Sequence, residues 1–67
     1  MDNNDMILEK LENLLPKFDI PIYRYKVNKN NLQWLKKNLG KRNKDNEYYK
    51  EASDLIDYCL DNKIYSS

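Results

Sequence analysis

Eight basic side chains and no carboxylate lie between residues 20 and 44, and this segment has the most distinctive chemistry in the chain. The formal charge is −3 over residues 1–19, +8 over residues 20–44 and −4 over residues 45–67. Such a block favours nucleic-acid binding, because each phosphate contacted by lysine or arginine releases condensed counterions. The predicted nucleic-acid-binding residues are Arg24, Lys26, Lys29, Lys36, Lys37, Lys41, Arg42 and Lys44, with Arg24 and Lys26 as candidate base readers. The alternative is that basic and acidic segments pair within one chain or across a dimer.

Two aromatic residues are candidate partner-binding residues. Trp34 is predicted to be partly buried, either as an anchor for a partner or as the rim of a small core. Tyr58 is surrounded by carboxylates at helical spacing, which favours a surface contact. Tyr23 and Tyr25 share one side of a predicted strand with Val27, so we expect them to belong to the core.

Missing residue types argue against catalysis. The chain has no histidine, one cysteine and one glycine. It therefore has no imidazole base, no Cys-type zinc site and no glycine-rich phosphate loop. Cys59 falls on a predicted apolar helix face, which indicates an inert core thiol. We predict a protein with no catalytic residue, metal, cofactor or small-molecule substrate.

The size of the chain predicts one small domain over residues 1–67 whose stability is marginal, so that a partner, and most simply a second copy in a homodimer, would help. A single free thiol fits the reducing cytoplasm. No apolar run approaches the roughly 18 residues that would span a membrane. Ten asparagines with many Lys, Ile and Tyr residues indicate an AT-biased genome, such as that of a low-GC bacterium, a phage or a mobile element.

Apolar spacing predicts three helices. The first places Ile7, Leu8, Leu11, Leu14, Leu15 and Phe18 on one face and should end near Leu15, before Pro16. The second should begin after the cap Asn28 and end at Gly40, whose backbone we expect to adopt the left-handed conformation. A basic linker, residues 41–44, should lead to a third helix capped by Asp45 or Asn46, with an apolar face of Tyr48, Ala52, Leu55, Ile56, Cys59 and Leu60.

Between the first two helices, residues 19–27 alternate with a period of two and are rich in β-formers. This pattern predicts one short strand. The fold class is therefore mostly α, three short helices with one strand between the first and the second; an all-α three-helix domain is the alternative.

The order of strand, helix, turn and helix over residues 20–60 resembles the ribbon-helix-helix family of DNA-binding proteins. The resemblance implies a dimer whose paired strands enter the major groove. It also implies that Ile22, Arg24 and Lys26 face DNA, while Tyr23, Tyr25 and Val27 pack inward.

Three functions remain open on these residues. The first is a small DNA-binding regulator acting through residues 20–44. The second is a protein-binding inhibitor or adaptor of phage or mobile-element origin, acting on a host defence or transcription protein through Trp34 or Tyr58. The third is an assembly subunit in which the acidic part of one copy meets the basic part of the next.

Overall fold

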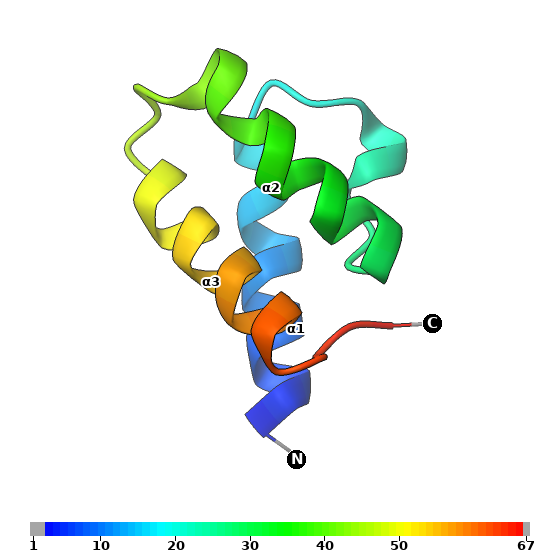
Figure 1. The fold of residues 1–67 in the computed structure, drawn as a ribbon. Coiled ribbons are helices and arrows are strands. Elements are labelled where there is room, and N and C mark those ends of the chain that lie inside the picture. The colour runs from blue at the N-terminus through cyan, green and yellow to red at the C-terminus, as the bar shows by residue number, and fades with distance from the viewer. Residues whose placement is uncertain (1–2, 67) are drawn as a thin grey trace.

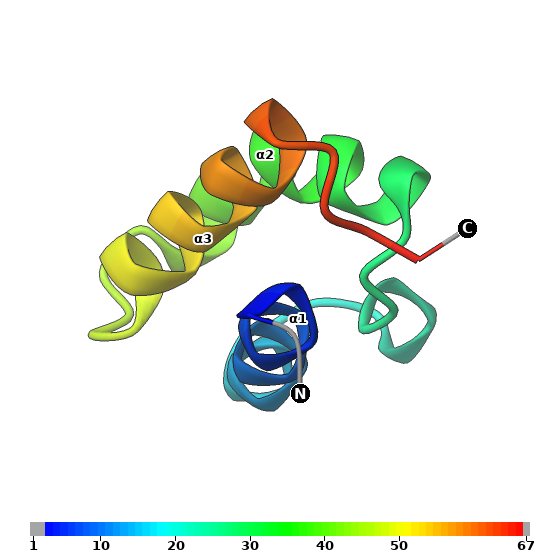
Figure 2. The same ribbon diagram turned by 90° about the horizontal axis from the view of Figure 1, so that it is seen from below.

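Three helices, α1 (Asn3–Leu14), α2 (Lys29–Asn43) and α3 (Tyr49–Asp61), form most of the computed structural model, which describes residues 3–66. The helices α2 and α3 lie side by side, and α1 packs beneath them (Figures 1 and 2). The prediction of a mostly α domain with three helices is confirmed.

All three helices contribute to one apolar core. The three leucines of α2 predicted to face inward are at most 2% exposed, because their spacing of three to four residues places them on one side of the helix. Ile64, which follows α3, is also buried. The buried apolar residues are Leu11, Leu14, Leu15, Phe18, Val27, Leu32, Leu35, Leu39, Ala52, Ile56, Cys59 and Ile64.

The strand predicted over residues 19–27 is wrong, because this segment contains a 3-10 turn, η2 (Ile22–Arg24). The backbone N–H of Arg24 donates to the carbonyl of Pro21 at 2.9 Å. The N–H of Tyr25 donates to Ile22 at 3.0 Å. Within residues 3–66 the only β-bridge joins Asn28 to Ser66, so no second strand is available to pair with this segment.

The boundaries of the three helices differ to varying degrees from those predicted. The helix α1 ends at Leu14 and passes into a 3-10 turn, η1 (Leu15–Lys17), close to the predicted end. The predicted linker over residues 41–44 is wrong up to Asn43, because α2 continues to that residue. The helix α3 begins at Tyr49, later than a cap at Asp45 or Asn46 would place it. Asn46 instead forms a turn, in which its Oδ1 accepts from the N–H of Tyr48 at 2.8 Å.

Gly40 does not have the left-handed conformation predicted for it. It lies inside α2, and a Cβ at this position would be 2.7 Å from the hydroxyl oxygen of Tyr49. Within residues 3–66, the residue with a positive φ is Lys63, at 55°. The N–H of Ile64 donates to Cys59 at 2.8 Å and that of Lys63 to Leu60 at 3.4 Å, the hydrogen bonds of a Schellman motif at the end of α3.

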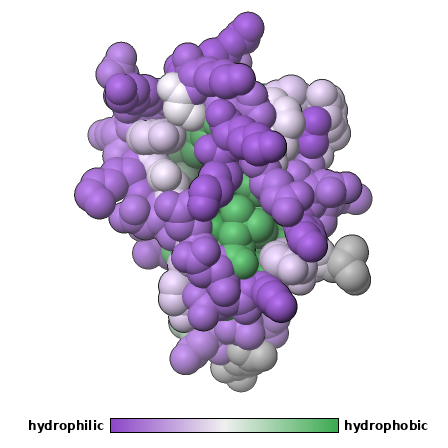
Figure 3. Space-filling model, in the orientation of Figure 1, coloured by the Kyte–Doolittle hydropathy of each residue, from purple (hydrophilic) through white to green (hydrophobic). Residues whose placement is uncertain are grey.

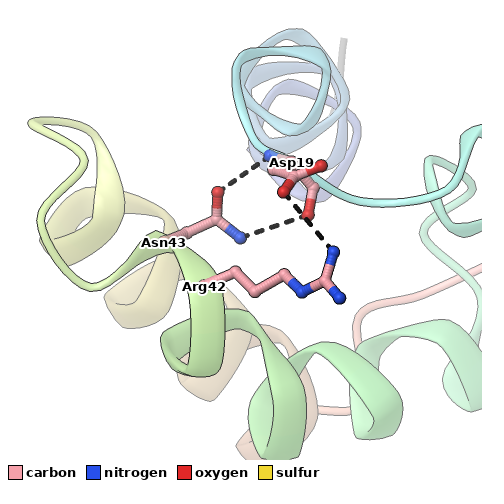
Figure 4. Close-up of polar contacts among 3 residues, drawn as sticks. All are labelled: Asp19, Arg42 and Asn43. Atoms are coloured by element: carbon pink, nitrogen blue, oxygen red, sulfur yellow. Dashed lines mark hydrogen bonds and ion pairs between the residues drawn. The ribbon is translucent and has the colours of Figure 1, made fainter.

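Asparagine side chains fix the irregular segment of residues 17–28 to α2 and to the turn that follows it. At one end, Asn43 Oδ1 accepts from the N–H of Asp19 at 2.8 Å and Asn43 Nδ2 lies 3.4 Å from the Asp19 carbonyl (Figure 4). Asn46 Nδ2 donates to the Lys17 carbonyl at 2.9 Å. These contacts replace the strand pairing that the segment lacks.

At the other end, Asn31 is buried and Asn28 caps α2. Asn31 Nδ2 donates to the carbonyls of Tyr23 at 3.1 Å and Lys26 at 3.0 Å. Asn28 Oδ1 accepts from the N–H of Asn31 at 2.8 Å, as predicted for the cap. The η2 turn is therefore attached to the first turn of α2.

Candidate nucleic-acid interface

The helix α2 presents most of the predicted basic residues on its outer surface. Because Leu32, Leu35 and Leu39 face the core, the intervening positions point away from it. Most of the surface in the view of Figure 3 is hydrophilic, with a hydrophobic area near its centre. The exposed basic residues of α2 are Lys29, Lys36, Lys37, Lys41 and Arg42, and Lys26 and Lys44 are exposed on either side of the helix.

Among the described residues, two of the eight predicted basic side chains form ion pairs with carboxylates. Lys36 Nζ lies 3.3 Å from Asp57 Oδ1 of α3. Arg42 Nη1 lies 3.7 Å from Asp19 Oδ2, and Figure 4 shows both Arg42 and Asn43 directed at Asp19. The side chains of Arg42 and Asp19 are 78% and 75% exposed, so this pair is solvated and contributes little to stability.

Five lysines of the basic block have no such partner. Within residues 3–66, no carboxylate oxygen lies within 4.0 Å of their Nζ atoms. All five are exposed, so their charges face solvent. We refer to Lys26, Lys29, Lys37, Lys41 and Lys44 as the free lysines.

Arg24 is half-buried between two aromatic side chains. Its guanidinium carbon lies 4.6 Å from the centre of the Trp34 ring and 5.1 Å from that of Tyr23. Its Nη1 donates to Asn31 Oδ1 at 3.1 Å, and its Nε is buried without a hydrogen-bond partner. We refer to Tyr23, Arg24 and Trp34 as the aromatic stack. Arg24 is held mainly by the protein itself, which leaves it less free to read bases than an exposed arginine.

A hollow of about 310 Å³ lies beside Trp34, between α2 and the segment before η2. Trp34 and Asn38 line the side formed by α2, and Ile20 and Pro21 line the other. Lys41 and the ion pair of Arg42 with Asp19 also border the hollow, so cations, one carboxylate, an aromatic ring and apolar side chains meet there.

The two tyrosines of residues 19–27 have different environments. Tyr25 packs against the core, as predicted. The prediction that Tyr23 is buried is wrong, because this residue is 68% exposed, next to Ile22 at 78%. The 3-10 turn causes this difference, since it breaks the alternation that would place both rings on one side. Trp34 is partly buried, as predicted.

The helix α3 presents an acidic surface that is distinct from the free lysines. Its Glu51 pairs with Lys10 of α1 at 3.0 Å, and Asp54 pairs with Lys50 at 3.2 Å. Tyr58 is 49% exposed on this surface and borders a shallow hollow with Leu55. The structure therefore separates the two predicted partner-binding residues, with Trp34 beside the lysines and Tyr58 among carboxylates.

Metal-ligand clusters, membrane-spanning helices and the single thiol can also be assessed in the described residues. Residues 3–66 contain no group of three or more His, Cys, Asp or Glu side chains placed to hold a metal ion. None of the described helices combines the length and apolar character needed to cross a membrane. Cys59 is fully buried, and this burial raises the pKa of its thiol.

Comparison with known proteins finds no matching family model, no similar curated protein and no similar solved structure. The functional assignment therefore rests on the geometry of the free lysines and the aromatic stack.

Proposed function

We propose that this protein is a non-enzymatic nucleic-acid-binding protein, a small DNA-binding regulator that contacts phosphates through the free lysines. The observation that carries the proposal is the absence, within residues 3–66, of carboxylate partners for five exposed lysines of one short segment, residues 26–44. Exposed ion pairs are worth under about 1 kcal/mol each, so folding alone does not require so many cations on one segment.

The aromatic stack supports the same function. Arginine and aromatic side chains placed next to lysines can contact bases while the lysines hold the backbone. Lys37 follows Trp34 by three positions on the same side of α2, and Lys41 is one further turn along.

The proposal does not depend on a ribbon between two chains. A dimer of the ribbon-helix-helix type would require residues 20–27 to become extended, whereas η2 is a turn in the described chain. Phosphate contacts by the free lysines need no such change. A homodimer remains a separate proposal, which sedimentation at several protein and salt concentrations would test.

The first experiment measures binding of a fluorescent 20-base-pair DNA by anisotropy between about 50 and 200 mM salt. We expect affinity to fall steeply with salt, with a slope of about −0.9 per neutralised phosphate. The variant K37A/K41A should lower the magnitude of this slope by roughly one for each lost contact.

The matched control is K10A/K50A, which removes the same charge from lysines paired with Glu51 and Asp54. We expect its salt slope to equal that of the unaltered protein. Absence of binding at about 50 mM salt would refute the proposal. An equal loss of affinity in both double variants would show that net charge, not the free lysines, determines binding.

One observation favours a protein-binding function as the second candidate. Ile22 and Tyr23 are adjacent, apolar and largely exposed at the tip of η2. Exposed aromatic residues of this kind often anchor protein interfaces. A complex recovered with the tagged protein that survives nuclease and disappears with I22S would favour this candidate; a complex lost on nuclease treatment would favour DNA binding.

A further inference from the structure

Tyr23 combines high exposure with a fixed backbone. Its carbonyl accepts from Asn31 Nδ2 at 3.1 Å, and the turn around it is closed by the hydrogen bond from Arg24 to Pro21. The residue is nevertheless 68% exposed. Because its backbone is already fixed, only the side-chain torsions of Tyr23 lose freedom when another flat group packs on the ring.

Arg24 links this ring to Trp34 of α2. Its guanidinium carbon lies 5.1 Å from the Tyr23 ring centre and 4.6 Å from that of Trp34. The guanidinium therefore lies against both rings, so that aromatic and cationic groups adjoin, as they do where nucleobases stack in single-strand-binding proteins.

Phosphate contacts are available next to this surface. Lys41 borders the hollow that Trp34 lines, and Lys37 lies one turn before Lys41 on α2.

We infer, building on the nucleic-acid binding proposed above, that the preferred ligand is single-stranded, with an unpaired base stacked on Tyr23 and adjacent phosphates held by Lys37 and Lys41. In a duplex the faces of the bases are covered by their neighbours, so only the phosphates would be contacted. The stacking contribution is independent of sequence, because every base has an aromatic face.

The test compares three ligands of equal length at one salt concentration of about 50 mM: single-stranded thymidine 12-mer, a 12-base-pair duplex, and an abasic 12-mer that retains its phosphates. Fluorescence of the single tryptophan, Trp34, and anisotropy of the labelled ligand report binding. We expect the thymidine strand to bind at least about fivefold more tightly than the abasic strand, the factor that corresponds to one stacked base.

Variants assign this preference to one ring. Y23L should abolish the difference between thymidine and abasic strands, and Y23F should retain it. The control Y58L alters an exposed tyrosine on α3 and should leave the preference unchanged. Circular dichroism verifies that each variant is folded.

The outcomes separate this inference from the proposed function. Equal binding of thymidine and abasic strands, tighter binding of the duplex, or a preference that survives Y23L would overturn the inference and leave phosphate binding intact. No binding to any of the three ligands would refute both.

Discussion

Asn43 of α2 forms hydrogen bonds with both backbone polar groups of Asp19, 24 positions earlier in the chain. Its Oδ1 is 2.8 Å from the Asp19 nitrogen, and its Nδ2 is 3.4 Å from the Asp19 oxygen. Asn43 is only 6% exposed, so these contacts are shielded from water. The Asn43 side chain thus supplies the backbone hydrogen-bond partners that a neighbouring strand supplies in a sheet.

Replacing Asn43 should destabilise the fold. N43A leaves the N–H and carbonyl of Asp19 without their partner, which costs about 1–3 kcal/mol. Urea unfolding should report a lower midpoint with an unchanged slope. R42A serves as the control, since it removes only an exposed ion pair with the same residue and should change stability by less than about 1 kcal/mol. Equal effects of the two substitutions would contradict a special role for Asn43.

Gly40 and Tyr49 should be energetically coupled. Alanine is favoured over glycine by about 1 kcal/mol inside a helix, but a Cβ at Gly40 would meet the Tyr49 hydroxyl oxygen at 2.7 Å. G40A should therefore gain little alone and should stabilise the protein by about 0.5–1 kcal/mol more in a Y49F background. A double-mutant cycle by chemical denaturation measures this difference, and strict additivity would argue against the close contact.

Replacing Lys63 with glycine should stabilise the fold. Its φ of 55° lies in the left-handed region, which costs a residue with a Cβ roughly 1–2 kcal/mol. We expect K63G to stabilise the protein by about 1 kcal/mol, measured by thermal and urea unfolding. K63A removes the same charge but keeps the Cβ, so it should give no comparable gain. If both variants gain equally, the effect comes from the charge and not from the backbone.

Cys59 should give stability a dependence on alkaline pH. Burial raises the pKa of the folded thiol above its ordinary value of about 8.5, so over this range the native state holds more protons than the unfolded state. Stability should therefore fall as pH rises beyond about 8.5. C59A lacks this titration and creates a small cavity, so its stability deficit should be constant below about pH 8 and shrink towards pH 10. A constant deficit across that range would contradict the raised pKa.

Apolar spacing was sufficient to predict the three helices, because the core-facing positions of α1, α2 and α3 repeat every three to four residues. The strand is predicted from the same kind of pattern, but it does not form. Alternation over residues 19–27 indicates which side chains share a face, but it cannot supply a second strand to pair with. The left-handed conformation is predicted at the wrong residue, because glycine is only the commonest residue with that conformation. Gly40 instead lies inside α2, where it packs closely against Tyr49.

The sequence predicts which residues could form the candidate site, but it does not predict how they are arranged. The eight basic residues follow from counting charges, whereas the ion pairs of Lys36 and Arg42 depend on which helices become neighbours. The asparagines were interpreted as a sign of genome composition. Four of them, Asn28, Asn31, Asn43 and Asn46, hold residues 17–28 in place. The position of these asparagines beside a segment without regular structure is the feature of the sequence that indicates this role.

The attachment of η2 to α2 through Asn31 has a kinetic consequence. Because the hydrogen bonds to Tyr23 and Lys26 exist without any ligand, the surface that we propose binds nucleic acid is preorganised. A ligand then meets a receptor that needs no loop to order around it. Association should be controlled by electrostatic steering and diffusion, with a single fast phase whose rate slows as ions screen the lysines.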